Sequence, residues 1–224
     1  MTSANCPARF GLAGLVGGAA LSLCLPAMAG DVTYDRLLKA NAEPQNWLMT
    51  YLTYDSHRDS PLSQINRSNV ANLRPRFAVG LGRATGVGVP LGQSIPLVDE
   101  GLMWATTGRA EVIAIDVRRG SSGQVLWRYD PKVEGDYLRN RGVAMLGNNV
   151  YVTMPDRPRM ISLDRMSGDV VWDINTGAAD YPPNQRHAAA PLAVKDMMVI
   201  AQSNGSAGNR AWIGAFKADG GKLA

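Results

Sequence analysis

Cysteine, histidine and clustered charge are scarce in this chain, and each scarcity removes a class of site. The two cysteines, Cys6 and Cys24, both lie within residues 1–29, so the remaining chain offers no disulfide, thiolate ligand or cysteine nucleophile. The two histidines, His57 and His187, lie far apart and lack metal-ligand spacing. The 23 basic and 19 acidic residues are scattered, which favours a solvated surface over a nucleic-acid partner. Carboxylates such as Asp99 fall in predicted turns, where we expect them to be solvated.

Residues 1–29 have the pattern of a cleavable signal peptide. Arg9 supplies a weak positive region, an apolar stretch rich in Gly and Ala follows, and the stretch ends in the small-x-small pattern AMAG. A retained membrane anchor is the alternative, but the segment is rich in small residues and Pro26 ends it. We expect cleavage after Ala29, which would release a cysteine-free chain into the periplasm.

Residues 30–91 are predicted to form an N-terminal wrap and a first strand. Thr33 can cap a short helix, and Asn66 or Ser68 can cap a second one in the stretch NRSNVANL. The stretch RFAVGLG, residues 76–82, has the composition of a strand.

Residues 92–224 change to a β pattern. Short β-branched or aromatic runs, such as EVIAID and NVYVTM, are separated by Gly, Asn, Asp and Pro at intervals of roughly ten residues. Trp127 and Trp172 are 45 residues apart, and Asp116 and Asp164 are 48 apart. A period in the forties with about four strands per unit is typical of propeller blades. The predicted fold is all-β: a β-propeller of four-stranded blades, incomplete at this length.

One phrase, written twice, supports the propeller. SLDRMSGDVVW begins at Ser162, and a first copy with a three-residue insertion begins at Ala114. In each copy a strand ends near an Asp, a Ser-Gly pair forms a turn, and the next strand ends in Trp. We expect positive φ angles at Gly123 and Gly168. We also expect the two tryptophans to stack between blades, with a largely buried indole at Trp172. Two ordinary hairpins with core tryptophans are the alternative.

These stretches resemble the tryptophan-docking motif of the quinoprotein alcohol dehydrogenases, the methanol and ethanol dehydrogenase family that uses pyrroloquinoline quinone (PQQ). The segments LLKANAEPQNWLMTY, SPLSQINRSNVANLRP, LWRYDPKV and NRGVAML are similar to that family's N-terminal segments, in the same order. The resemblance covers residues 31–224. It implies an eight-bladed propeller of well over twice this length, of which this chain would form roughly the first half, with PQQ on the central axis beside a calcium or lanthanide ion. It also implies a carboxylate base in a later blade, a small alcohol as substrate and a periplasmic cytochrome as electron acceptor.

At the cofactor site, this sequence matches the family at one position and departs from it at several others. Arg141, in NRG, takes the position of a cation beside the PQQ oxygens, and a surface or blade-bridging arginine is the alternative reading. Gln93 replaces a family Glu, and Ala188 replaces a Thr. Gly135-Asp136 stands where the family has adjacent cysteines, and Ser206 stands in place of the metal-binding Glu. Since a hydroxyl is a poor replacement for a carboxylate on Ca²⁺, we expect no metal ligand at Ser206 and weak cofactor binding by this chain alone.

A third copy of the phrase begins at Ala215. Lys217 replaces its Asp, Gly221 falls at the seventh place, and the expected Trp would follow directly after Ala224. The sequence is therefore expected to be the front part of a longer protein or a product cut short. An incomplete ring leaves strand edges open, so a second polypeptide is one way to complete it.

Two functions follow from these expectations. The first is the N-terminal part of a periplasmic PQQ-dependent alcohol dehydrogenase that oxidises a primary alcohol, with this chain inactive by itself because the catalytic base lies in a later blade. The second is a non-catalytic PQQ-repeat propeller, either a decayed paralogue or a periplasmic binding scaffold.

Overall fold

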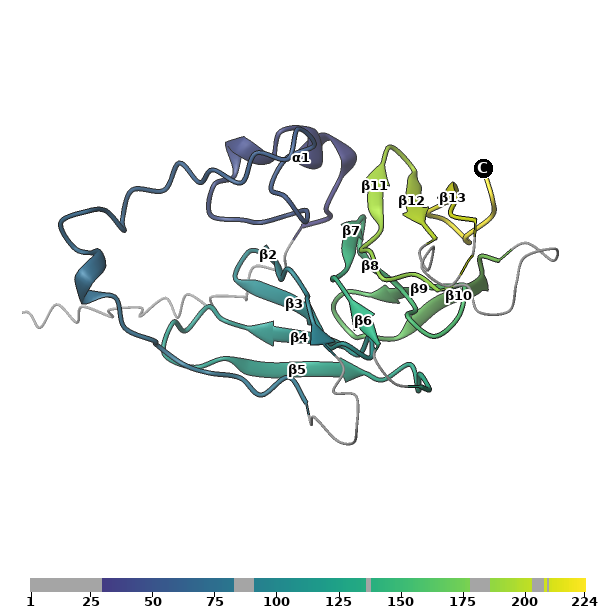
Figure 1. Cartoon of the computed structure of the whole chain (residues 1–224). Helices are drawn as coiled ribbons and strands as arrows, with labels where there is room; N and C mark the ends of the chain where they lie inside the picture. Colours follow the sequence, from purple (N-terminus) through teal and green to yellow (C-terminus); the bar gives the residue numbers. More distant parts are fainter. Residues whose placement is uncertain (1–29, 83–90, 136–137, 178–185, 203–207, 209) are drawn as a thin grey trace, which may run out of the picture.

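The computed structural model describes residues 30–82, 91–135, 138–177, 186–202, 208 and 210–224, and these form three consecutive propeller blades with an N-terminal segment packed across them (Figure 1). None of the helices in these ranges is long and apolar enough to span a membrane. The expected all-β, incomplete propeller is confirmed.

The first two blades are four-stranded antiparallel sheets in which each strand pairs with the next along the chain. The strands of blade 1 are β2 (Leu97–Asp99), β3 (Leu102–Thr106), β4 (Val112–Asp116) and β5 (Gln124–Tyr129). Those of blade 2 are β7 (Ala144–Leu146), β8 (Asn149–Thr153), β9 (Arg159–Asp164) and β10 (Val170–Asn175).

Blade 3 has three strands among the described residues: β11 (Leu192–Val194), β12 (Met197–Ala201) and β13 (Ile213–Lys217). A bridge between Phe216 and Leu223 adds the first residues of a further pairing along β13. A separate two-stranded parallel pair, β1 (Leu91–Gly92) and β6 (Arg139–Asn140), links the entries to blades 1 and 2.

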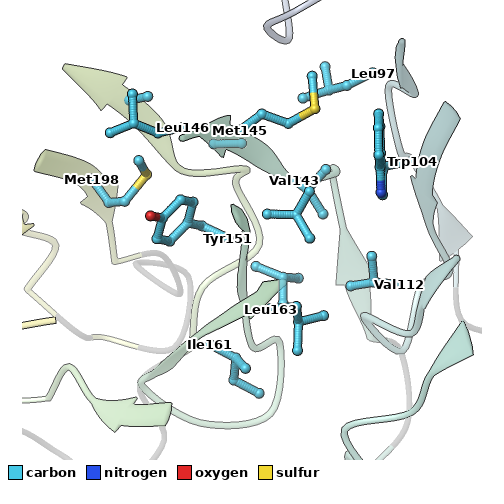
Figure 2. Close-up of a cluster of buried hydrophobic side chains, with 14 of the residues drawn as sticks. Leu97, Trp104, Val112, Val143, Met145, Leu146, Tyr151, Ile161, Leu163 and Met198 are labelled. Atoms are coloured by element: carbon cyan, nitrogen blue, oxygen red, sulfur yellow. The ribbon is translucent and has the colours of Figure 1, made fainter. Parts of the chain in front are cut away.

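The core lies between adjacent blades, because each sheet is apolar on the faces that meet its neighbours. Leu97, Trp104 and Val112 from blade 1 point toward Val143 and Leu163 from blade 2 in one shared cluster (Figure 2). All five side chains are buried. The indole N–H of Trp104 is not lost in this core, since it donates to the Arg165 carbonyl at 3.1 Å. Blade stacking therefore buries the apolar faces that hold the sheets together.

The N-terminal segment begins with helix α1 (Tyr34–Leu38). Its cap is confirmed: the Thr33 hydroxyl accepts from the Arg36 N–H at 3.2 Å. The second expected helix is only a 3₁₀ turn, η2 (Val70–Asn72), and no side chain caps it. A short 3₁₀ turn, η1 (Ala40–Ala42), follows α1.

The strand predicted at residues 76–82 is wrong: this stretch has no regular strand pairing with the described residues. It is held along β5 by side chains instead. Arg76 donates to the Gly120 carbonyl and Arg128 to the Leu81 carbonyl. Hydrophobic composition predicted the extended backbone here, but ladder formation needs a partner strand that composition does not specify.

A buried ion-pair cluster fastens the N-terminal segment to blades 1 and 2. Asp99 is fully buried, so the expectation of a solvated carboxylate is wrong. It accepts from Arg36 Nη2 at 2.7 Å and from Arg165 Nη1 at 2.6 Å. Arg36 and Arg165 also donate to the Gly30 carbonyl. Asp99 thus lies at the end of β2 and not in a solvated turn, and its carboxylate joins the N-terminal segment, blade 1 and blade 2.

Candidate functional site: a cavity between β1, β6 and the N-terminal segment

Gln93 and Arg141, the two cofactor-binding residues predicted from the sequence, line the same cavity. The parallel pair of β1 and β6 explains why. Gly92 is the register partner of Asn140, so the two residues that follow, Gln93 and Arg141, leave the strands side by side. Both side chains are exposed to the cavity and solvent.

The cavity has a volume of about 310 Å³, at the lower end of the range for small-molecule sites. Its other walls come from the N-terminal segment and the entry to blade 3. The N-terminal residues are Met49, Thr50, Tyr51, Thr53, Tyr54 and Ser56, and the remaining ones are Ile95 and Ala189 to Leu192. The lining is therefore apolar with several hydroxyls, one amide and one guanidinium.

Two aromatic residues shape the N-terminal wall. The Tyr54 hydroxyl donates to the Ala193 carbonyl at 2.6 Å, and burial raises the pKa of Tyr54 to about 12. Tyr54 is thus a neutral donor that ties the wall to blade 3. Tyr51 lies under the Arg58 guanidinium, 4.3 Å from ring centroid to Cζ. Leu52 between them has a φ of +71°, a left-handed conformation that is uncommon for a bulky residue, and its side chain is buried.

The cavity suits an anionic or carbonyl-rich ligand better than a metal ion. A guanidinium, an amide and hydroxyls donate hydrogen bonds to oxygens, as a quinone and its carboxylates require. No carboxylate lies among the described lining residues, and a hard divalent ion requires several oxygen ligands, usually including carboxylates. The residues present therefore fit PQQ oxygens and do not fit a calcium or lanthanide ion. Ser206, which replaces the metal-binding Glu of the family, lies outside the described residues, and so does Asp136.

The one acidic cluster with metal-like spacing in the described ranges is Glu43, Asp99 and Glu100. Its charge is already balanced by arginines. Arg36 donates to Glu43 Oε2 at 2.6 Å and lowers the pKa of that carboxyl. We therefore interpret this cluster as the ion-pair junction of the N-terminal segment.

The other sequence-predicted positions have structural roles here. The Ala188 carbonyl accepts from the Arg141 N–H at 3.1 Å, so the position joins the cavity wall through its backbone. Gly135 has a φ of +99° in the loop before β6.

The docking tryptophans each reach the next blade. Trp127 donates from its indole to the Arg165 carbonyl at 3.2 Å, and Trp172 donates to the Ala218 carbonyl at 3.0 Å. Arg165 and Ala218 both hold the fourth place of the repeated phrase in the following blade. Trp127 and Trp172 are both mostly but not fully buried, in line with the largely buried indole expected at Trp172.

The turns of the phrase follow the same register in its second and third copies. The Gly168 N–H donates to the Asp164 carbonyl at 2.8 Å, and the Gly221 N–H donates to the Lys217 carbonyl at 3.0 Å. Both glycines have positive φ. The expected positive φ at Gly123 is wrong, because the three-residue insertion moves the left-handed turn to Gly120.

Sequence reasoning missed the polar groups that hold Arg141. Asn140 and Thr153 are buried beside it, and both carry side-chain hydrogen bonds across blades. A signal existed in NRGVAML, where the polar Asn140 lies just ahead of the apolar run VAML.

Comparison with known proteins places the fold and its repeats in one family. The family model for the "Glucose/ethanol/alcohol dehydrogenase, beta-propeller domain" matches residues 47–222. The dehydrogenase subunit of a quinone-dependent alcohol dehydrogenase from Gluconacetobacter polyoxogenes is 33% identical over 202 residues, which cover 85% of this chain and 26% of that protein. Quinohemoprotein alcohol dehydrogenase ADH-IIG from Pseudomonas putida is 33% identical over 210 residues, 89% of this chain and 28% of that one.

Solved structures agree. The structure of quinohemoprotein alcohol dehydrogenase ADHIIG from Pseudomonas putida HK5 superimposes with a TM-score of 0.77 and 31% identity, covering 88% of this chain and 28% of its own. A europium-containing methanol dehydrogenase superimposes with a TM-score of 0.72 and 28% identity, covering 84% and 33%. The chain thus spans about a quarter to a third of the length of these relatives. By its repeats, its blades and this match, the chain belongs to the PQQ β-propeller family of quinoprotein alcohol dehydrogenases, of which it represents the N-terminal portion.

Proposed function

We propose that this chain supplies the first blades and one wall of the cofactor site of a periplasmic PQQ-dependent alcohol dehydrogenase that oxidises a primary alcohol and passes electrons to a cytochrome. The observation that carries the proposal is the convergence of Gln93 and Arg141 in one cavity. The signal-peptide pattern of residues 1–29 supports export.

Bound PQQ would accept the reducing equivalents of the alcohol, as it does in the family. The residues of this chain would bind and orient it. The Arg141 guanidinium would donate to cofactor oxygens and balance their negative charge, and the Gln93 amide would add a neutral contact. The apolar walls formed by Met49, Ile95 and Leu192 would exclude water from one side.

The chain alone is proposed to be inactive. Its described cavity residues include no carboxylate to act as general base or to bind a metal. Arg141 by itself offers one cation and a few hydrogen bonds, which corresponds to a dissociation constant of about 1 mM for PQQ.

Calorimetric titration of PQQ with excess Ca²⁺, and then with a lanthanide, into the mature chain measures this directly. A dissociation constant in the micromolar range or below would contradict the proposed weak binding of PQQ by the chain alone.

A complementation experiment tests the enzyme role itself. Residues 30–224 would be co-expressed with ADH-IIG lacking its corresponding first part, and PQQ-dependent alcohol oxidation would be measured with an artificial electron acceptor. We expect activity only when both parts are present, and a loss of about 100-fold with Arg141→Ala. Arg139→Ala, an exposed arginine on the same strand β6, is the matched control and should retain activity.

The second candidate is the non-catalytic propeller, by decay or as a binding scaffold. The absence of carboxylates from the described cavity lining favours it. Under this alternative the co-expressed parts would assemble and stay inactive, and Arg141→Ala would change nothing.

A further inference from the structure

Asn140 is a fully buried polar side chain at the end of β6, directly before Arg141. Both the oxygen and the nitrogen of its amide are hydrogen-bonded. Its Oδ1 accepts from the Thr106 hydroxyl at 2.7 Å and from the Gly142 N–H at 2.9 Å. Its Nδ2 donates to the Thr153 carbonyl at 2.9 Å. A buried amide in this arrangement fixes every group that it touches, because each would be left unsatisfied without it.

The three partners belong to different segments. Thr106 ends β3 of blade 1, Thr153 ends β8 of blade 2, and Gly142 lies on the connection into β7. The Thr153 hydroxyl extends the chain of hydrogen bonds by donating to the Ala189 carbonyl at 2.7 Å, at the entry to blade 3. Asn140 is therefore the central member of a buried polar network that joins three blades.

The backbone of Arg141 is held on both sides of this network. Its N–H donates to the Ala188 carbonyl at 3.1 Å, and its carbonyl accepts from the Ile95 N–H at 3.3 Å. Gly142 has a φ of +122°, and a Cβ there would lie 3.1 Å from the Ile95 carbonyl oxygen, so the chain turns tightly after Arg141.

The guanidinium of Arg141 shares no hydrogen bond or ion pair with the described residues. The described contacts therefore fix the backbone from which Arg141 projects and leave its charge available to a ligand in the cavity. A cation that must meet a ligand oxygen at hydrogen-bond distance requires such a fixed base.

We propose that Asn140, with Thr106 as its partner, is a positioning residue that aims Arg141 into the cavity and thereby sets the affinity for the cofactor. This rests on the proposed function, in which Arg141 faces the quinone. Asn is required because the site needs one acceptor for two donors and one donor for a carbonyl. Asp would lose the donor to the Thr153 carbonyl, and an aliphatic residue would leave three groups unsatisfied.

The first arm of the experiment needs no cofactor. Amide hydrogen exchange is measured by NMR on the mature chain for the wild type, Asn140→Ala and Thr106→Val. We expect the exchange of the Arg141 and Gly142 amides to rise about 10-fold beyond any change in global exchange, as the loss of one buried hydrogen bond gives. Thr106→Val removes one hydroxyl and keeps the side-chain shape, so it tests the proposal even if Asn140→Ala does not fold.

Two variants provide controls. Asn46→Ala removes another buried asparagine, one that hydrogen-bonds Glu43 and Glu100 in the N-terminal segment. It should lower global stability without selective exposure of the Arg141 amide. Thr106→Ser retains the hydroxyl, so the Arg141 and Gly142 amides should exchange as they do in the wild type. If Asn46→Ala exposes the Arg141 amide as much as Asn140→Ala does, the positioning role is overturned.

The second arm titrates PQQ, without metal, into isotope-labelled chain and follows the amide and Nε–H signals of Arg141. We expect the same dissociation constant for the wild type, Asn46→Ala and Thr106→Ser, and at least about 10-fold weaker binding for Asn140→Ala and Thr106→Val, since one hydrogen-bonded contact would be misaligned. Unchanged affinity in those two variants would overturn the proposal. If PQQ moves no Arg141 signal in the wild type, the proposed function fails, and the exchange arm still decides whether Asn140 holds Arg141.

Discussion

Asp99 illustrates how one buried residue can carry a large share of the connection between segments. Its carboxylate lies between Arg36 and Arg165, and the side chains of Asp99 and Arg165 are both fully buried. Breaking a buried pair costs more than a surface pair, because the remaining charge stays in a poorly solvated place. This cost gives a test of the junction between the N-terminal segment and the blades.

Asp99→Ala is expected to lower the free energy of unfolding by about 3–5 kcal/mol, measured by urea denaturation. Asp196→Ala is the control, since Asp196 is an exposed carboxylate paired with Lys217 at 2.8 Å. Its loss should cost less than about 1 kcal/mol. Equal effects of the two substitutions would show that the Asp99 cluster is not a stabilising junction.

His187 predicts a pH dependence of stability. Its Nδ1–H donates to the Ala201 carbonyl at 3.0 Å and its Nε2 lies 2.7 Å from the Thr176 hydroxyl, which donates to the neutral ring. Burial lowers the pKa of His187 below its usual value near 6.5. Because the unfolded chain binds this proton more readily, stability should fall as the pH drops below about 6.5.

Unfolding free energies at pH 7.5 and 5.5 measure this slope. His187→Gln should flatten it, whereas His57→Gln, at an exposed histidine, should leave it in place. A slope that survives in His187→Gln would assign the pH dependence to other groups.

At the scale of elements, the repeated phrase builds one blade-to-blade contact twice. In each case the tryptophan on the outer strand of one blade donates to the carbonyl at the fourth place of the phrase in the next blade. The glycine turn of the phrase comes shortly after this fourth place in the sequence. At Gly168 that turn also receives the Trp127 ring. The spacing of the phrase therefore encodes an interface rather than a hairpin alone.

Gly168→Ala tests this contact. Gly168 has a φ of +80°, and an added Cβ would lie 2.7 Å from the Trp127 ring. Gly120→Ala is the matched control, because its φ is +64° and an added Cβ would meet no atom within 4 Å. We expect Gly120→Ala to cost about 1–2 kcal/mol, for backbone conformation alone. Gly168→Ala should cost about 1–3 kcal/mol more, for the displaced ring. Equal costs would contradict close packing at Gly168.

Replacing Trp172 with Ala should lower the free energy of unfolding by less than replacing a fully buried tryptophan does. Its ring lies 5.7 Å from the Tyr151 ring between centroids, and the residue is mostly but not fully buried. Trp172→Ala should lower the unfolding free energy by about 3 kcal/mol, and Trp104→Ala by about 5 kcal/mol, the two ends of the range for aromatic truncation. A Trp172→Ala variant that melts like the parent would remove its docking role.

At the scale of the whole molecule, the blades and the N-terminal segment depend on one another. The segment from Gly30 to Val32 lies against blade 2, since Val32 and Gly147 exchange backbone hydrogen bonds at 3.0 and 2.9 Å. Arg36 holds the carbonyls of Gly30 and Asp31. The residues directly after the expected cleavage site are thus part of the fold.

Export makes a prediction at the same scale. Intact-mass measurement on periplasmic extract should find a chain that begins Gly30-Asp31-Val32 and has no thiol. Ala29→Pro, a control that blocks cleavage by removing the small residue at the junction, should retain the leader. A mature chain that reacts with a thiol reagent would contradict processing at this position.

The sequence by itself determined the fold class and its repeat. Strand runs, turn residues and the spacing of Trp127 and Trp172 are local properties, set by side-chain size, backbone freedom and alternation. They can therefore be recognised in the amino-acid sequence alone. The same holds for the cap at Thr33, whereas Arg141 and Gln93 became candidates through the resemblance to the quinoprotein alcohol dehydrogenases.

Only the tertiary structure decided which of these residues meet, and in what surroundings. The pairing of β1 with β6 brings Gln93 beside Arg141, 48 positions later in the chain, and the junction of three segments buries Asp99. Residues 76–82 pair with no strand of the described part of the chain, and the left-handed turn lies at Gly120 instead of Gly123. Burial, partner strands and register depend on contacts between distant segments, and no local pattern specifies those contacts.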